Sequence, residues 1–143
     1  MTDKNITVID VLKAARSKIC SHDNWIRGIA AATDDGDWVE PSHPEACKWC
    51  ASGAVRSVFP QYQKDNRIYR KDQDVLLNFA NNRDRHMFFK TVGILTCLTW
   101  CNDLIKYNDD ENTNHKDIIN LFDRAIAAYV FEPQWQKEDY ENG

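Results

Sequence analysis

Four of the five cysteines in this 143-residue chain occur in two pairs whose spacing suits a metal ion. Cys47 and Cys50 form a Cys-x-x-Cys, and Cys97 and Cys101 stand one helical turn apart. Four thiolates can hold a tetrahedral zinc ion. Unligated cysteines are also among the most buried residues and behave as small apolar side chains. Because both pairs fall in predicted helices, we favour buried thiols and expect no metal or cofactor. A structural zinc site remains an alternative.

Cys50 is also the candidate for a nucleophile. The segment at residues 46–55 loosely resembles the cysteine helix of papain-like proteases, in which a helix N-terminus and a histidine activate the thiol. His86 or His115 would supply the histidine, and Asn102 would orient it. The chain lacks the strand-rich half that carries the histidine and asparagine in those enzymes. We therefore assign no catalytic residue.

Tryptophans and two polar residues complete the set that could bind a ligand. Tryptophan is mostly a core residue whose indole N–H seeks an acceptor. Asn102 and Asp103 directly follow an apolar segment, where they predict a helix stop and a turn; buried together, they would form a polar network inside the domain. The ligand or interaction candidates are Trp25, Cys50, Trp100, Asn102 and Asp103.

Helical periodicity predicts the elements that position these residues. The predicted helices span residues 7–20, 44–59, 74–80, 84–103 and 113–132. After Lys90 the fourth of them is uncharged on every side, which is typical of a helix in the middle of a domain. The segment 34–37, Asp-Asp-Gly-Asp, predicts a tight turn, and a short β-hairpin near 28–39 is compatible with it.

The expected fold is therefore mostly α. It is a single-domain bundle of four to five helices around a buried central helix at about 84–103. The domain is expected to occupy residues 1–132, and an acidic, flexible tail to occupy residues 133–143.

Composition and charge narrow the function classes. Hydrophobic residues make up 43% of the chain, enough for a core, and the net charge of −4 disfavours nucleic acid as a partner. Residues 56–90 hold eight basic and four acidic side chains, whereas residues 101–143 hold four basic and ten acidic ones. Such an asymmetry suits a charged partner protein, and a homodimer is the alternative.

The compartment follows from the ends and the cysteines. The polar N-terminus has no apolar signal core. The uncharged run 91–101 is much shorter than the ~20 residues of a membrane span. An odd number of cysteines argues against a disulfide framework. We expect a cytoplasmic protein that does not enter a membrane.

The short motifs resemble a family of small bacterial and phage-associated helical proteins of unknown function. The matching segments are Asn24-Trp25, then Cys50-Ala51-Ser52-Gly53-Ala54, then Trp100-Cys101-Asn102-Asp103, and then the helix at 113–128. Cys101 is an insertion in the Trp-Asn-Asp motif of that family. Of the four paired cysteines, the resemblance implies only Cys50. It implies no activity.

Taken together, the sequence favours a non-enzymatic interaction module, a phage or mobile-element factor that binds and inhibits or modulates a host protein. One alternative is a small enzyme or ligand-binding protein with a site between the Cys50 helix and Asn102 and Asp103. The other is a structural zinc protein that uses Cys47, Cys50, Cys97 and Cys101.

Overall fold

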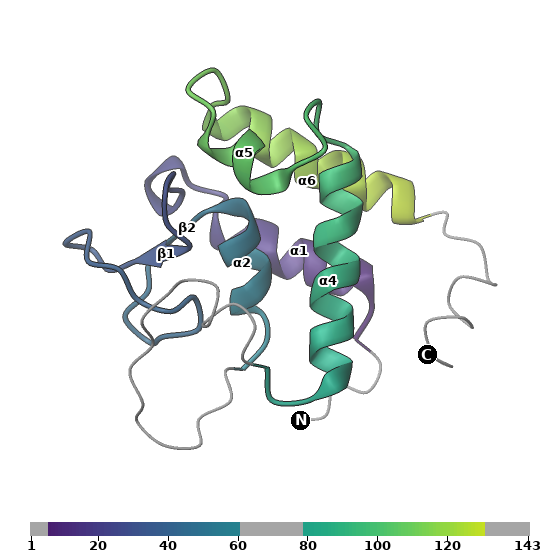
Figure 1. The fold of residues 1–143 in the computed structure, drawn as a ribbon, viewed down its shortest axis with the longest axis horizontal. Coiled ribbons are helices and arrows are strands. Elements are labelled where there is room, and N and C mark those ends of the chain that lie inside the picture. The colour runs from purple at the N-terminus through teal and green to yellow at the C-terminus, as the bar shows by residue number, and fades with distance from the viewer. Residues whose placement is uncertain (1–5, 61–78, 131–143) are drawn as a thin grey trace.

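The computed structural model describes residues 6–60 and 79–130 and confirms a mostly α fold (Figure 1). These residues form five α-helices, one short 3-10 helix and a two-stranded antiparallel sheet. In chain order the elements are α1 (Val8–Lys18), η1 (His22–Asn24), β1 (Ala31–Ala32), β2 (Lys48–Trp49), α2 (Ala51–Ser57), α4 (Asn82–Cys97), α5 (Leu104–Asp109) and α6 (His115–Val130). The expected helix at 74–80 falls almost entirely outside the described residues, and the tail at 133–143 falls wholly outside them.

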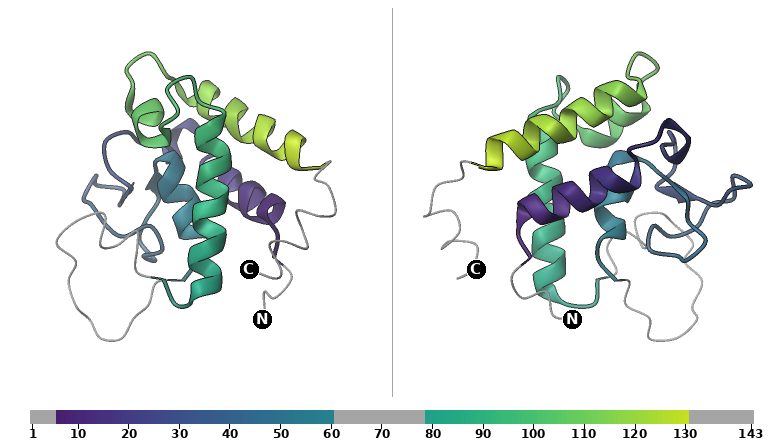
Figure 2. Two further views of the ribbon diagram at one scale, coloured as in Figure 1. Left: turned by 45° about the vertical axis from the view of Figure 1, so that its right-hand side comes forward. Right: turned by 180° about the vertical axis from the view of Figure 1, so that it is seen from behind.

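The first helix begins where the sequence predicts it. Thr7 and Asp10 form a reciprocal capping box, in which each side chain accepts the backbone N–H of the other residue. The helix buries Val11, Leu12 and Ala15, and it packs against α2, α4 and α6. Seen from behind, α1 lies beside α6 and crosses α4 (Figure 2). Helix α4 packs against four helices in turn, α1, α2, α5 and α6.

The helix expected at 84–103 is shorter and less buried than predicted. It ends at Cys97, and it buries only one face, formed by Met87, Phe88, Thr91 and Leu95. The opposite side, with Gly93, is exposed. The prediction treated an uncharged face as an apolar one. Threonine, glycine and cysteine carry no charge, but their small side chains leave little apolar area to bury.

The helix expected at 44–59 begins only at Ala51. The residues before it pair with β1 instead, with Ala31 opposite Trp49 and Ala32 opposite Lys48. Neither Cys47 nor Cys50 is inside a helix. The paired residues are 16 and 18 positions apart in sequence, so a local period could not reveal the pairing.

The predicted tight turn is present, and the hairpin around it is minimal. Thr33 donates its N–H to the carbonyl of Asp37 at 2.9 Å, and Gly36 adopts a φ of 91°, which favours glycine. Beyond the turn only one bridge, between Ala32 and Trp38, joins the two arms. The regular partner of β1 is β2.

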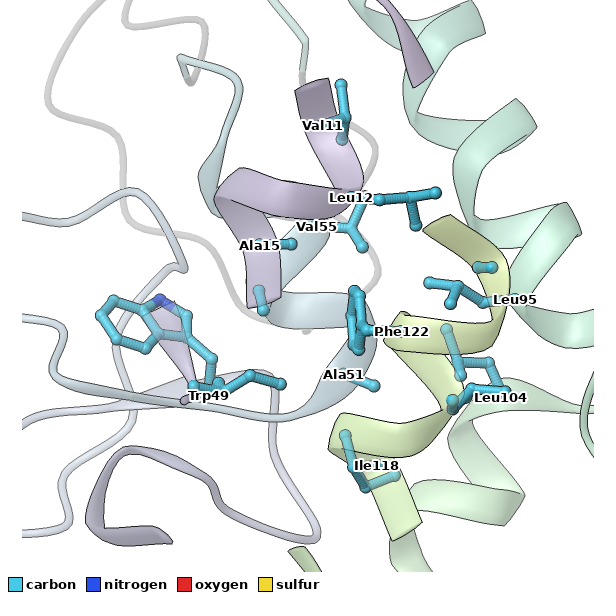
Figure 3. Packing of buried hydrophobic residues seen from close by; sticks show 14 of the residues in the cluster. Val11, Leu12, Ala15, Trp49, Ala51, Val55, Leu95, Leu104, Ile118 and Phe122 are labelled. Carbon is cyan, nitrogen blue, oxygen red and sulfur yellow. The ribbon is translucent and has the colours of Figure 1, made fainter. Parts of the chain in front are cut away.

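The core lies where the helices meet. Figure 3 shows side chains from all five described helices gathered in one region, and Leu12 and Phe122 there have no exposed surface. Burying a side chain of that size stabilises the fold by about 1.5–3 kcal/mol. The labelled members are Val11, Leu12, Ala15, Trp49, Ala51, Val55, Leu95, Leu104, Ile118 and Phe122.

Among the helices of residues 6–60 and 79–130, none combines the length and apolar character that crossing a membrane requires.

Candidate functional site

Asn108 in α5 is the centre of a buried polar network. Its Oδ1 accepts the indole N–H of Trp25 at 2.7 Å and the backbone N–H of Ala51 at 2.9 Å. Its Nδ2 donates to the carbonyl of Ile26 at 3.2 Å and to Asp109 Oδ1 at 3.0 Å. The side chain is only 1% exposed, so these bonds replace the water that it gave up on folding. The network fastens the chain after η1 to the start of α2 and to α5.

Trp25, a predicted candidate, thus has a structural role in this network. It is 9% exposed, and its indole N–H is occupied by Asn108. The guanidinium of Arg27 lies over its ring at 4.8 Å from the centroid. The sequence did not single out Asn108, because an asparagine inside a short polar helix gives no local signal of burial.

Cys50 is the N-cap of α2, and it is buried. Its sulfur accepts the N–H of Gly53 at 3.3 Å and lies 3.4 Å from the hydroxyl of Ser52. Burial raises the pKa of the Cys50 thiol, while these two hydrogen bonds partly oppose the shift. A raised pKa leaves a neutral thiol at neutral pH, whereas a cysteine nucleophile reacts as the thiolate.

Of the two histidines proposed for Cys50, His86 is exposed on α4, and His115 is hydrogen-bonded elsewhere. His115 Nε2 lies 2.7 Å from the carbonyl of Ile19, which can only accept, so this nitrogen carries the proton. Its ring also lies beside that of His22, with centroids 5.5 Å apart. The arrangement around Cys50 is that of a helix cap.

The four paired cysteines do not assemble into a zinc site. Cys50 is buried, Cys47 and Cys101 are half-buried, and Cys97 is exposed. Across residues 6–60 and 79–130, no three side chains of histidine, cysteine, aspartate or glutamate come together in a way that could hold a metal ion.

Asn102 and Asp103 lie on the surface and form the joint between α4 and α5. Asn102 has a φ of 56°, a left-handed conformation that asparagine tolerates better than most residues. Asp103 caps α5 by accepting the N–H of Lys106 at 3.0 Å. Both are exposed. The buried polar network considered for this pair is built around Asn108 instead, and Asn108 is also what binds α5 to the Cys50 helix.

Trp100, the remaining candidate, is 67% exposed and stands at a surface cavity of about 390 Å³. The cavity lies where the α4–α5 and α5–α6 connections meet, and we call it the Trp100 pocket. Its lining residues are Trp100, Tyr107, Asp110, Asn112, Thr113 and Asp117. The rings of Trp100 and Tyr107 are 6.5 Å apart and inclined at 67°. The pocket therefore combines two aromatic rings with two carboxylates.

Local hydrogen bonds hold both carboxylates in place. Asp110 Oδ1 accepts the N–H of Asn112 at 2.7 Å. Asp117 Oδ2 accepts the N–H of Asn114 at 3.0 Å and completes the cap of α6. Each bond uses one of the two oxygens of its carboxylate.

The pocket is negatively charged. Burial raises the pKa of Tyr107, and the charge of Asp117 raises it further, while Arg124 acts in the opposite direction. Tyr107 therefore senses Asp117 and keeps its proton at neutral pH. Residues 103–117 hold five acidic and two basic side chains, which places a net negative charge around the cavity.

These features define a small helical domain with a minimal sheet, a polar network that fixes the core and an aromatic, acidic pocket on the surface. The chain belongs to the DUF6197 family, a family of unknown function, which it matches over residues 3–128. Neither a curated protein nor a solved structure matches the chain.

Proposed function

We propose that this chain is a non-enzymatic interaction module, a phage or mobile-element factor that binds and modulates a host protein through the surface around the Trp100 pocket. The observation that carries the proposal is the exposure of Trp100, at 67%. Burial of apolar surface is favourable by about 25 cal/mol per Å², and an exposed aromatic ring does not gain this free energy. Tryptophan is also the residue type most enriched among those that dominate the energy of protein interfaces.

The other sequence candidates support a binding role over catalysis. The neutral, buried thiol of Cys50 caps a helix, and the indole of Trp25 is bound by Asn108. Both contribute to the fold. Ile105, 53% exposed on α5, adds apolar surface to the same part of the chain as Trp100.

Site-specific photo-crosslinking tests the proposal. A photoreactive amino acid would replace Trp100 in the cells that naturally produce the protein, and Phe89, 43% exposed on α4, provides the control position. We expect one host protein to be crosslinked from position 100 and not from position 89. Purified, this partner should bind the wild-type chain and Phe89→Ala, but lose most of its affinity for Trp100→Ala. Equal crosslinking from both positions, or binding unaffected by Trp100→Ala, would contradict the proposal.

Native mass spectrometry, before and after a chelator, tests the competing functions. The proposal requires the mass of the bare chain. One bound zinc ion, whose removal unfolds the protein, would favour the zinc alternative. A retained small molecule would favour the ligand-binding or enzyme alternative. A dimer that Trp100→Ala dissociates would make the partner a second copy of this chain.

A further inference from the structure

We infer that the Trp100 pocket binds the guanidinium group of an arginine side chain in a basic segment of the partner. The inference rests on the proposed function, and it adds the chemical group that the partner must present.

The aromatic rings provide the first half of such a site. A cation placed over the face of tryptophan within ~6 Å is attracted by the ring quadrupole, and tryptophan is the strongest aromatic partner. Arginine is preferred over lysine here because its planar, weakly hydrated guanidinium stacks on a ring. Trp100 has an exposed ring, and Tyr107, inclined at 67° to it, is a second ring beside the cavity.

The carboxylates provide the second half. Asp110 comes directly after α5, and Asp117 stands in the first turn of α6, so two separate elements bring negative charge to one cavity. Their bonds to the backbone of Asn112 and Asn114 restrict both side chains before any ligand arrives. Less conformational entropy is then lost on binding. Hydrogen bonds between guanidinium and carboxylate are charge-assisted and roughly twice as strong as neutral ones.

The balance of nearby charges favours a cation. The N-terminus of α6 opposes it with a partial charge of roughly +0.5. Two full negative charges on Asp110 and Asp117 exceed this. Two cations among the described residues lie nearby, and neither lines the pocket. Arg27 lies over the ring of Trp25 and donates to the carbonyl of Thr113, and Arg124 donates to the carbonyl of Leu98 at 3.1 Å. At about 390 Å³ the cavity is at the small end of ligand pockets, which span ~300–1,000 Å³, so it suits a side chain better than a large cofactor.

A matched set of three peptide probes tests the inference on the full chain. Three capped tripeptides, Gly-X-Gly with X as arginine, lysine or citrulline, would be titrated into isotope-labelled protein and followed by NMR. Citrulline keeps the shape of arginine and removes its charge. We expect saturable shifts of the Trp100 indole N–H and the Asn112 and Thr113 amides with arginine, weaker shifts with lysine and none with citrulline. Equal shifts with citrulline, or none with arginine, would overturn the inference.

Charge-neutralising variants locate the site. Asp110→Asn and Asp117→Asn keep an oxygen that can accept the local backbone bond, and each should weaken arginine binding roughly three- to fivefold, as expected for a partly exposed pair. The matched control is Asp35→Asn, in the exposed turn after β1, with no expected effect. Unchanged affinity for the arginine peptide in both pocket variants would show that arginine does not bind in the Trp100 pocket.

The two proposals fail separately. A host partner that depends on Trp100, together with an inert arginine peptide, leaves the interaction module standing and removes the arginine. If the arginine peptide binds but no host protein does, the guanidinium-binding pocket stands and the interaction module fails.

Discussion

Trp25 and Asn108 are 83 residues apart in sequence, yet the indole N–H of one donates to the side-chain oxygen of the other at 2.7 Å inside the domain. The same oxygen accepts the N–H of Ala51. One amide therefore connects three segments that no local interaction would bring together. The contact holds the C-terminal end of α5, where Tyr107 and Asp110 line the Trp100 pocket, against the core.

The first prediction removes that amide. Asn108→Ala leaves the indole N–H of Trp25 and the backbone N–H of Ala51 buried without their acceptor. Each orphaned group costs about 1–3 kcal/mol, so the free energy of unfolding should fall by roughly 2–6 kcal/mol. Urea denaturation followed by circular dichroism measures it. The control is Asn120→Ala on the exposed face of α6, expected to change stability by no more than ~0.5 kcal/mol. A loss for Asn108→Ala no larger than that of the control would show that the network carries no stability.

The second prediction compares two glycines. A Cβ added at Gly53 would lie 2.0 Å from the carbonyl oxygen of Ala30, a backbone atom that also accepts the N–H of Cys50. Relief of this clash requires movement of the sheet against α2, so Gly53→Ala should destabilise the fold by ~3 kcal/mol or more. Gly93 meets nothing within 4 Å and lies on the exposed side of α4. Gly93→Ala should therefore stabilise the protein by about 0.4–1 kcal/mol. Equal thermal midpoints for the two variants would refute the close packing at Gly53.

These packing contacts mark the limit of what the sequence predicts. Both ends of the described chain, α1 and α6, were predictable because their caps are local: Thr7 with Asp10 and Asn114 with Asp117. The residues around Cys47 were predicted wrongly as helix, since their pairing with β1 depends on a distant strand.

The candidate site, too, was predictable only in part. The sequence singled out Trp100, because it precedes Asn102 and Asp103 in the segment that resembles a Trp-Asn-Asp motif. It gave no sign of the pocket, because Tyr107, Asp110 and Asp117 reach Trp100 only through the turns at both ends of α5.

The third prediction concerns thiol reactivity. Burial raises the pKa of Cys50 above the ordinary value of 9.0, so the thiol stays neutral near pH 8 and alkylates slowly. Short pulses of iodoacetamide, analysed by mass spectrometry, should modify the exposed Cys20 and Cys97 first and Cys50 last. In urea Cys50 should react as fast as the others. Early modification of Cys50 in the native protein would contradict the assignment of a capping thiol and revive a nucleophilic one.

The sign of the corresponding pH effect on stability follows from the same shift. A pKa raised in the folded state means that the folded protein binds its proton more tightly. This stabilisation is present below pH 9.0, the ordinary value for cysteine, and it is lost as the pH rises through the folded pKa. Cys50→Ser should remove this loss of stability at alkaline pH. Cys20→Ser, at an exposed position, should not.

The last prediction reports on the field inside the Trp100 pocket. Burial is the larger cause of the raised pKa of Tyr107, and the charge of Asp117 is the next. Asp117→Asn should therefore lower the pKa of Tyr107 but leave it above its ordinary value. The ring-carbon NMR signal of Tyr107, assigned with Tyr107→Phe, measures this titration. The control is Asp123→Asn. Asp123 lies on α6, like Asp117, but its carboxylate pairs with Arg16 of α1. An equal shift in both variants would mean that Tyr107 senses only the overall charge of α6. A shift specific to Asp117 would support the negative pocket that a guanidinium requires.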